Sequence, residues 1–531
     1  MNIHNIKSSN MQIFTQSEKM KEEYCASIVR VQHLEPVENS DNLVKTVIGG
    51  YNIVCNKSTI NEGDVVIYCK NETRLNYEFL SKNNLFEMGS REQNSNYEEV
   101  QKLINEGHEA EAKKLVGFFN KKGRLKMIRL RGCPSMGIIF KADSLVRWNE
   151  RFKDIKLEDY IEHDDEGNEI PFNFDTIDGV MFIKAYVPEV HGKRKRNQGS
   201  TQKRKSTVKL FDRIIPEYFK FNYDTKMLND NVWRFKPDDS VYITVKMHGT
   251  SAIFANVPTR VPKRLKPWQA IHNLGVRIAS LFVAKRERDI YLNDHLAENF
   301  SVEYGNICSS RRVPRNRYVG QGYDDGEFDI WNWYNEKIKG YIPEGMTVYG
   351  EVCGYIPDTD TMFQSPYDYG CDVGKCFLIP YRITTISKED GSIVEMEMED
   401  VYKWTIDLIN KNPELFTDIV KPVTLLYHGT LHDLYPNLDI DIHWHENLLE
   451  AMKNDTEHFG MEQNEPLCVS AVPREGIVIR KDGDNVAEAF KLKSMNFLLY
   501  EGKRIESGVM DSEMMEGFAM EDGETEENEF A

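Results

Sequence analysis

The sequence lacks the features of secreted and membrane-spanning proteins. No apolar run in it approaches the roughly 18 residues of a membrane span. The first residues, Met1 to His4, show neither the charge nor the apolar stretch of a secretion signal. Nine cysteines are scattered over 531 residues with no C-x-x-C pair among them. We therefore expect reduced thiols, a cytoplasmic location and no contact with a membrane.

The sequence also lacks an excess of positive charge, because its formal net charge is -18. This charge is unevenly spread along the chain. No lysine or arginine follows Arg504, and nine acidic residues lie between 511 and 529, whereas residues 193–205 include seven lysines and arginines. The basic and the acidic segment could partly screen each other, so the net charge does not exclude nucleic acid as a partner.

The N-terminal third alternates as short β-strands do. The composition, 40% hydrophobic and 11% aromatic, is sufficient for ordinary cores, and the length indicates two or three domains. A helix is expected over residues 97–119, where Gly107 would break it. Strands separated by turn-rich segments are predicted at 26–31, 43–48, 64–68, 125–131 and 136–140.

Residues 24–142 are therefore expected to form a small OB-like β-barrel with a helical insertion, a fold that often binds nucleic acid. A β-domain with a purely structural role is the alternative. From 143 to 209 the chain turns polar and charged, which predicts a linker. Its basic cluster would contact phosphates, remain solvated without any contact, or serve as a nuclear-import signal.

The chemistry of the chain centres on residues 245–251, which read V-K-M-H-G-T-S. A strand-like run from Val241 leads to a single lysine, Lys246. Gly249 follows, where the backbone can turn without a side chain in the way. This arrangement suits a nucleophilic amine that faces a phosphate pocket. Taken alone, however, the pattern more often belongs to a surface lysine in a hairpin turn.

Four later stretches combine charge with glycine, serine or a strand pattern. Residues 309–312 place two serines beside two arginines, which suit ribose and phosphate oxygens. Glu351 lies in an apolar strand between glycines, and Glu475 begins another apolar strand. In residues 490–494 charged and apolar residues alternate, so both lysines are expected on one face of a strand and Phe490 and Leu492 in the core.

In this order the stretches resemble the motifs of the covalent nucleotidyltransferases, the superfamily of DNA ligases, RNA ligases and mRNA capping enzymes. Lys246 to Gly249 resembles motif I, Ser310-Arg311 motif Ia, Glu351 to Gly354 motif III, Glu475-Gly476 motif IV and Lys491 to Lys493 motif V. Residues 376–383 fall where motif IIIa belongs, and Tyr381 would there stack on adenine. One such motif is unremarkable, but five in order are specific.

The branch of the superfamily is indicated by the order of the domains. DNA ligases and capping enzymes place an OB domain after motif V, whereas here 38 residues follow Lys493 and end in the acidic segment. The sequence thus resembles two-domain RNA ligases, and His248 resembles a variation among them. The resemblance implies an α+β fold: an N-terminal OB-like barrel, then a nucleotidyltransferase domain of antiparallel sheets with helices at 210–505. Residues 506–531 are expected to be a disordered acidic tail.

Some positions depart from the family pattern. Residues 260–300 are expected to be an insertion, helical from Ile271 to Val283, and the segment 400–468 is also long. Val245 occupies a place often held by glutamate, and Arg382 one often held by aspartate. His443 and His445 beside Glu446 fit the start of a helix better than a metal site.

The resemblance implies ATP as the nucleotide and Mg²⁺ (or Mn²⁺) as the metal. The amine of Lys246 would attack the α-phosphate and expel pyrophosphate, AMP would pass to a 5′-phosphate end, and a 3′-hydroxyl would then displace AMP. Glu475, with Glu351, would hold the metal, and Glu351 would alternatively accept from the ribose. The nucleotide would contact Lys246, His248, Gly249, Ser251, Arg311, Glu351, Tyr381, Lys491 and Lys493, and the catalytic residues would be Lys246, Glu475, Lys491 and Lys493.

The implied partner is RNA, in a nicked duplex with a 3′-OH RNA end. The protein is expected to be a monomer, and a viral source is one hypothesis for its origin. Two other functions stay open at this point. An mRNA guanylyltransferase would use the same lysine with GTP, and a non-catalytic RNA-binding protein with a ligase-like fold would never be labelled covalently. No G-x-x-x-x-G-K-[ST] loop occurs, so strand ends would have to arrive as 3′-OH and 5′-phosphate.

Overall fold

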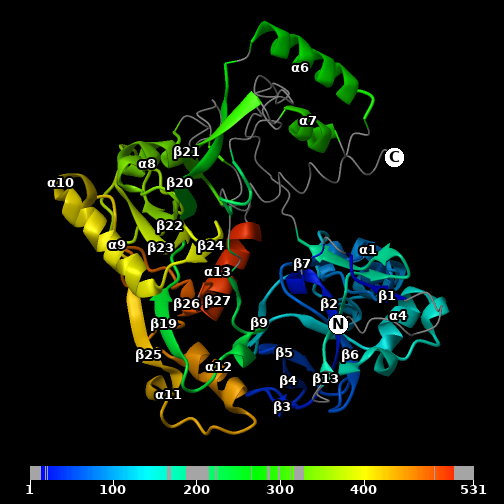
Figure 1. Ribbon diagram of the computed structural model, residues 1–531. Helices are drawn as coiled ribbons and strands as arrows, with labels where there is room; N and C mark the ends of the chain where they lie inside the picture. Colours follow the sequence, from blue (N-terminus) through cyan, green and yellow to red (C-terminus); the bar gives the residue numbers. More distant parts are fainter. Residues whose placement is uncertain are drawn as a thin grey trace. The chain divides into compact units, whose positions relative to one another are not determined.

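The computed structural model forms two compact units, Met1–Glu189 with Glu501–Lys503 and Val190–Tyr500 with Arg504–Ala531 (Figure 1). It describes residues 13–17, 20, 22–163, 169–186, 214–221, 223, 225–264, 266–283, 288–296, 299–311, 314–315, 328–483 and 485–506. The basic cluster at 193–205 and the acidic segment at 511–529 therefore lie outside the described residues. No helix in the described part of the chain is long and apolar enough to cross a membrane.

The first unit consists of short antiparallel sheets around one apolar core (Figure 1). Its largest sheet has the strand order β11-β6-β2-β14, formed by Ile138–Phe140, Val65–Cys69, Ala26–Arg30 and Phe172–Phe174. The other sheets are β3-β4-β5 (Glu35–Pro36, Leu43–Ile48, Tyr51–Asn56), β17-β7-β8 (Ile183–Ala185, Thr73–Leu75, Arg124–Leu125), β1-β15-β16 (Phe14–Thr15, Thr176–Ile177, Val180–Met181), β10-β9 (Cys133–Ser135, Ile128–Leu130) and β12-β13 (Glu162–His163, Glu169–Ile170). Within the described residues, these sheets are separate and do not close into one barrel.

The predicted strands at 26–31, 43–48 and 64–68 are confirmed as β2, β4 and β6. The helical segment is also confirmed, together with its break. Helix α2 (Tyr97–Asn105) ends before Gly107, whose φ of +83° is a left-handed conformation that a side chain would disfavour. Helix α3 (Glu109–Ala112) begins two residues later.

The predicted linker at 143–209 is wrong for its first part. Strand β14 pairs with β2, with Phe172 opposite Ile28. Between α1 (Tyr77–Lys82) and α4 (Ala142–Trp148), the rings of Phe79 and Trp148 lie edge to face at 5.8 Å. Residues 143–163 and 169–186 thus belong to the first unit. The sequence concealed this because the buried residues are widely spaced among charged ones: Leu145, Trp148, Phe152, Leu157, Phe174 and Phe182.

The second unit contains two five-stranded sheets. The first has the order β18-β27-β26-β19-β25, formed by Lys226–Met227, Glu488–Lys493, Gly476–Lys481, Ser240–Val245 and Leu425–Thr430. Helices α11 (Leu431–Leu434) and α12 (Trp444–Asn454) pack on one face of it (Figure 1). That face is built from alternate apolar residues of the three central strands, because successive side chains of a strand point to opposite faces: Val241, Ile243, Ile477, Ile479, Phe490 and Leu492.

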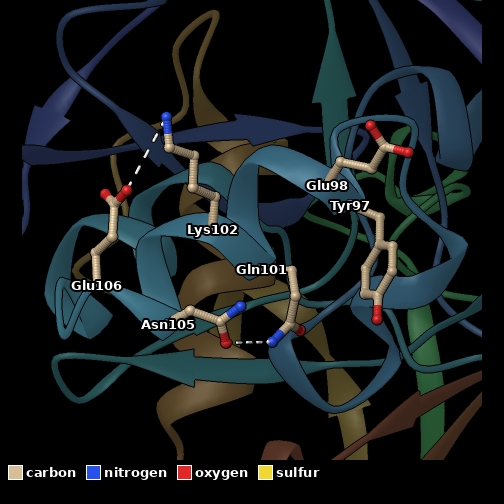
Figure 2. A pocket seen from close by; sticks show the side chains of 6 residues that line it. All are labelled: Tyr97, Glu98, Gln101, Lys102, Asn105 and Glu106. Atoms are coloured by element: carbon tan, nitrogen blue, oxygen red, sulfur yellow. Dashed lines mark hydrogen bonds and ion pairs between the residues drawn. The ribbon is translucent and has the colours of Figure 1, made fainter.

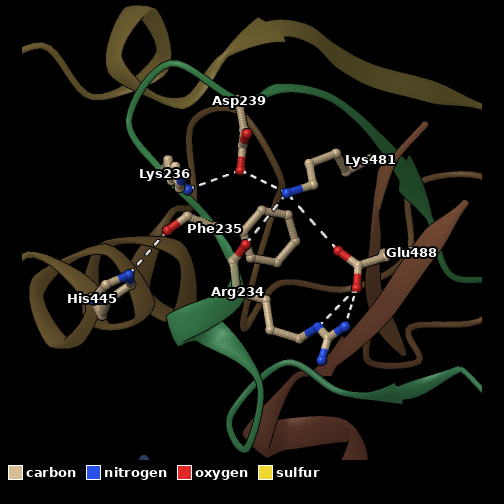
Figure 3. A network of polar contacts seen from close by, with 7 residues as sticks. All are labelled: Arg234, Phe235, Lys236, Asp239, His445, Lys481 and Glu488. Atoms are coloured by element: carbon tan, nitrogen blue, oxygen red, sulfur yellow. Dashed lines mark hydrogen bonds and ion pairs between the residues drawn. The ribbon is translucent and has the colours of Figure 1, made fainter. Parts of the chain in front are cut away.

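Polar contacts hold the segment of the chain that leads into β19 (Figure 3). Arg234, at the end of the short helix η6 (Val232–Arg234), forms an ion pair with Glu488 at the start of β27. The Lys481 amine at the end of β26 lies 3.0 Å from a carboxylate oxygen of Asp239. His445 Nε2 lies 2.9 Å from the carbonyl oxygen of Phe235. Helix α12 begins at Trp444, so the prediction of a helix start at His443 to His445 is confirmed.

The second sheet has the order β21-β20-β22-β23-β24, formed by Phe300–Ser309, Thr250–Pro262, Met346–Gly354, Cys376–Ile386 and Ile393–Glu395. Helices α8 (Ile330–Ile338), α9 (Met398–Lys411) and α10 (Pro413–Phe416) cover one face of it (Figure 1). Helices α6 (Pro267–Ser280) and α7 (Arg288–Leu296) connect β20 to β21, so the expected insertion at 260–300 lies at the tip of this strand pair. Helix α13 (Met495–Glu506) follows β27.

A buried ion network joins the two sheets. Glu395 of β24 lies 2.8 Å from the Arg382 Nε of β23 and 3.3 Å from an Arg480 Nη of β26. All three side chains are buried. The Arg382 guanidinium also lies 4.5 Å from the centre of the Tyr223 ring. The departure from the family pattern at Arg382 therefore has a structural reason, since this arginine is a buried counter-charge for Glu395, which in turn reaches Arg480 of the other sheet.

We expect Glu395→Ala to destabilise the protein by about 3–5 kcal/mol, because the buried Arg382 guanidinium would lose its counter-charge and Arg480 would keep only Asp482. Thermal unfolding measures the effect, and Glu397→Ala, two residues further along and exposed, is the control. An unchanged melting temperature for Glu395→Ala would contradict the structural role of the network.

Candidate active site

Lys246 lies directly after β19, at the edge where the two sheets of the second unit meet. Its backbone N–H donates to the carbonyl oxygen of Gly476 at 3.0 Å, and the preceding Val245 pairs with Ile477. The Val245 N–H also donates to Thr424 at 3.0 Å. The lysine therefore follows a strand that is held on both sides, which fixes the start of its side chain.

The Lys246 amine faces a buried carboxylate. Its Nζ lies 2.7 Å from Glu475 Oε1, and the Nζ of Lys493 lies 3.8 Å from the same oxygen. Glu475 is 3% exposed, whereas the side chains of Lys246 and Lys493 are 24% and 20% exposed. Two partly accessible amines thus share one inaccessible carboxylate, an arrangement that places positive charge at the surface of the site.

The position of Glu475 depends on the glycine that follows it. Gly476 has a φ of +142°, and a Cβ there would lie 2.0 Å from the carbonyl oxygen of Leu492. Strand β26 can approach β27 this closely only without a side chain. The buried Ser494, directly after β27, holds the same place, because its N–H donates to the carbonyl oxygen of Glu475 at 2.9 Å and its hydroxyl to the carbonyl oxygen of Arg474 at 2.6 Å.

Arg474 is in turn fixed by a buried partner. Its Nε donates to Glu465 at 2.9 Å, and its Nη1 donates to the carbonyl oxygen of Phe459 at 2.5 Å. The guanidinium thereby anchors the chain immediately before Glu475.

Contacts from three directions hold the turn after Lys246. The Gly249 N–H donates to Glu351 Oε1 at 3.1 Å, and Gln364 donates to the Gly249 carbonyl at 3.1 Å. The His248 N–H donates to the hydroxyl of Tyr369 at 2.7 Å. A Cβ on Gly249 would lie 2.4 Å from the carbonyl oxygen of Val352, so no other residue fits. Glu351, expected to contact ribose or metal, here supports the turn.

His248 lies inside the site. Its ring is edge to face with Tyr367 at 5.0 Å and with Phe497 at 5.2 Å, and its Nδ1 lies 3.9 Å from Glu475 Oε2.

Burial raises the pKa of Tyr369, whose hydroxyl accepts from the His248 N–H, well above its usual range, with nearby Cys353 and Glu475 adding to the effect. This phenol therefore stays protonated at neutral pH and its hydroxyl remains neutral beside the turn.

Three further candidates share one end of the second sheet. Ser251 pairs with Glu351 across β20 and β22, so their side chains point to the same face. Strand β21 ends at Ser309, which pairs with Ile253, and Arg311 follows two residues beyond this end. Tyr381 packs beside an apolar cluster on the face of Ser251 and Glu351. The structure thus brings Ser251, Glu351 and Tyr381 to one face, although Tyr381 already has apolar neighbours.

The predicted alternation in β27 is confirmed. Phe490 and Leu492 are buried against the core with α12, whereas Lys491 and Lys493 are half-buried on the opposite face. Lys491 pairs with Val478 and Lys493 with Gly476, so both amines come from the strand next to Glu475.

Sequence reasoning missed the residues that hold the site from behind. Glu465, Arg474 and Ser494 fix the chain at Glu475. Gln364 and Tyr369 hold the turn after Lys246, and Tyr367 packs against His248. The only signal was their nearness to the motifs, because their contacts arise from the tertiary fold. Burial likewise raises the pKa of Cys371 to about 12, so this thiol stays protonated.

A hollow on the first unit has no comparable chemistry. It measures about 370 Å³ and is lined by six residues of α2 and its end (Figure 2). Lys102 faces Glu106 at 4.0 Å, and Gln101 donates to Asn105 at 3.1 Å, so these side chains contact one another.

The chain is similar to an OB-fold domain family and to solved structures of an RNA ligase. A model of an OB-fold domain family matches residues 25–99. No curated protein matches the sequence. A solved structure of a Naegleria gruberi RNA ligase variant with ATP and Mn is 14% identical, with a TM-score of 0.47, and covers 90% of this chain and 98% of that chain. The same ligase with PPi is 14% identical, with a TM-score of 0.48, and covers 91% and 100%.

The family match confirms an OB fold for residues 25–99 of the first unit. The α+β fold is confirmed in the second unit, whose sheets are antiparallel except for the parallel pair of β18 and β27. The likeness to the solved structures says nothing by itself of what this chain does.

We expect Gly476→Ala to abolish any reaction at Lys246 and to destabilise the protein by about 1–3 kcal/mol, since a Cβ would separate β26 from β27. Self-labelling with radioactive nucleotide and thermal unfolding measure the two effects. Gly340→Ala is the control, because no atom lies within 4 Å of a Cβ there. Normal labelling of Gly476→Ala would show that the strands need not be this close.

Proposed function

We propose that this protein is an ATP-dependent RNA ligase that seals 3′-OH and 5′-phosphate ends, at nicks in duplexes, through an AMP-carrying lysine. The observation that carries the proposal is that the amines of Lys246 and Lys493 lie 2.7 and 3.8 Å from the same oxygen of Glu475, beside a glycine turn held by Glu351. A structural lysine would need neither a buried carboxylate shared with a second amine nor a turn fixed from three directions.

Glu475 and Glu351 fit a divalent cation that is held partly by these carboxylates and partly by the phosphates of the nucleotide. Glu475 Oε2 is buried and has no hydrogen-bond partner among the described residues. No group of three or more His, Cys, Asp or Glu side chains that could hold a metal occurs in that part of the chain. Mg²⁺ characteristically takes one or two carboxylates together with water and substrate phosphates. Glu475, with Glu351 nearby, would supply the carboxylates, and the cation would neutralise phosphate charge.

The first step requires two changes at Lys246. Its amine must leave the ion pair with Glu475 and lose a proton, because an ammonium has no lone pair. It must then form a bond to the α-phosphorus while pyrophosphate leaves, which keeps the phosphate tetrahedral. Lys491 and Lys493 would hold the α-phosphate oxygens. Ser251, Arg311 and Tyr381 would contact ribose and base on the second sheet.

Two transfers would follow at the same place. A 5′-phosphate oxygen of the RNA attacks the lysine-bound AMP, the nitrogen–phosphorus bond breaks and the amine is released. A 3′-hydroxyl then attacks the activated 5′-phosphate and AMP leaves as the new phosphodiester forms. His248, beside Glu475, would donate a hydrogen bond to the departing phosphates.

We expect Lys246→Ala and Lys246→Arg to abolish labelling by ATP, since alanine has no amine and a guanidinium stays protonated. The measurement is denaturing electrophoresis after incubation with α-labelled ATP. Lys481→Ala, on the same sheet but in the network of Figure 3, is the matched control and should label normally. Labelling by GTP in place of ATP would instead identify a guanylyltransferase, and labelled Lys246→Ala would locate the nucleophile elsewhere.

We further expect the two units to divide the work. A protein that begins at Ser206 should still react with ATP, because every proposed catalytic residue lies in the second unit. It should seal nicked RNA far more slowly, since alignment of a strand end is worth several kcal/mol, about 7–11 in the best cases. Rates of labelling and of nick sealing, compared with the whole chain, test this. Equal sealing rates would assign the OB-fold unit another role.

A further inference from the structure

Helix α6 exposes an apolar surface. Trp268, Ile271, Leu274, Ile278, Leu281 and Phe282 are between 52% and 87% exposed. Their spacing of three and four residues places them along one side of the helix and of the turn that follows it. The opposite side is occupied, because the buried Val276 packs with Leu292 and Leu296 of α7. The apolar side thus faces outward and is kept there by α7.

This surface is also basic. Residues 260–283 include Arg260, Lys263, Arg264, Lys266 and Arg277, and no aspartate or glutamate. These residues belong to a longer acid-free run, from 240 to 286, in a chain with a net charge of -18. The side chains of Arg264, Lys266 and Arg277 are exposed. We call the apolar residues of α6 together with these three cations the α6 surface. An occupant of it needs apolar groups and negative charge together.

The C-terminal segment of the same chain has that chemistry. Residues 507–531 include nine acids and no lysine or arginine. Apolar residues are interleaved with these acids, and Met510, Met514 and Phe518 recur every fourth residue. Methionine adapts readily to apolar surfaces of varied shape. A purely solubilising tail would need the acids but not the methionines and the phenylalanine.

The segment can also reach the α6 surface. It continues from α13, which ends at Glu506 in the same unit as α6. Twenty-five residues extend to about 80 Å at about 3.3 Å per residue. A folded unit of this size has a radius of gyration of only about 20 Å. Covalent attachment raises the effective concentration to the millimolar range, so a weak contact suffices.

We propose that the acidic segment 507–531 docks on the α6 surface, with its methionines and Phe518 on the apolar residues and its acids beside the three cations. Docking covers a basic and apolar helix that would otherwise adsorb polyanions or other apolar surfaces. A membrane with anionic lipids and a second copy of the chain are the competing occupants, and the segment is favoured because it is tethered to the same unit.

Photo-crosslinking in the whole chain tests the proposal. Ile271 is replaced by a photoreactive benzoyl-phenylalanine, and crosslinked peptides are identified by mass spectrometry. Ile442, an isoleucine that is 89% exposed elsewhere on the same unit, carries the same group in the control. We expect crosslinks from position 271 to residues 507–531 of the same chain, at a yield independent of protein concentration. At 1 M salt, where the Debye length is about 3 Å, the yield should fall severalfold.

Proteolysis of the same whole chain gives a second readout. A glutamate-specific protease should cut after Glu513 and Glu516 severalfold faster in Ile271→Asp than in the wild type. Ile442→Asp should leave the rate unchanged. Equal rates in all three proteins would overturn the proposal.

Other crosslinking results would also overturn it. Crosslinks between two chains that increase with concentration would make a second copy the occupant. Binding of the whole chain to phosphatidylserine vesicles, lost in Ile271→Asp, would show that the surface is open and serves a membrane. None of these readouts depends on ligase activity, so they are independent of the proposed function.

Discussion

The second unit depends on the close approach of β26 and β27 at Gly476. This approach brings Glu475 to within 2.7 Å of Lys246 and 3.8 Å of Lys493. A buried carboxylate is expensive to desolvate unless cations compensate it, so Glu475 favours a geometry in which both amines turn toward it. The same carboxylate forms the ion pair with Lys246. Under the proposed function, a cation that competes for Glu475 would free the Lys246 side chain from this ion pair.

The site remains in place because its supports are rigid and buried. Arg474 and Ser494 fix the chain at Glu475, while Gln364 and Tyr369 fix the turn beyond Lys246. The network of Arg382, Glu395 and Arg480 joins the two sheets that contribute these residues. Catalysis by positioning needs reacting groups held to within a fraction of an ångström, and strands held by buried polar contacts provide this better than loops do.

Local patterns predicted those parts of the structure that depend on local order. The alternation of residues 490–494 correctly predicted which side chains of β27 face the core. The presence of a glycine at 107 correctly predicted the break between the two helices. The linker prediction was wrong because Trp148, Phe174 and Phe182 are too far apart in sequence to show a period. Arg382 could not be interpreted from sequence, since its partner Glu395 and the strand of Arg480 become neighbours only in the folded sheets. The roles of the ten predicted site residues stay predictions, although the structure gathers them around two adjoining sheets.

The proposed function requires that Lys246 becomes covalently attached to AMP. Intact-protein mass spectrometry after incubation with ATP and Mg²⁺, followed by peptide mapping, tests it most directly. We predict one added AMP on the peptide that contains Lys246, removed again when pyrophosphate is supplied. An unmodified protein, or AMP on a peptide without Lys246, would contradict the account.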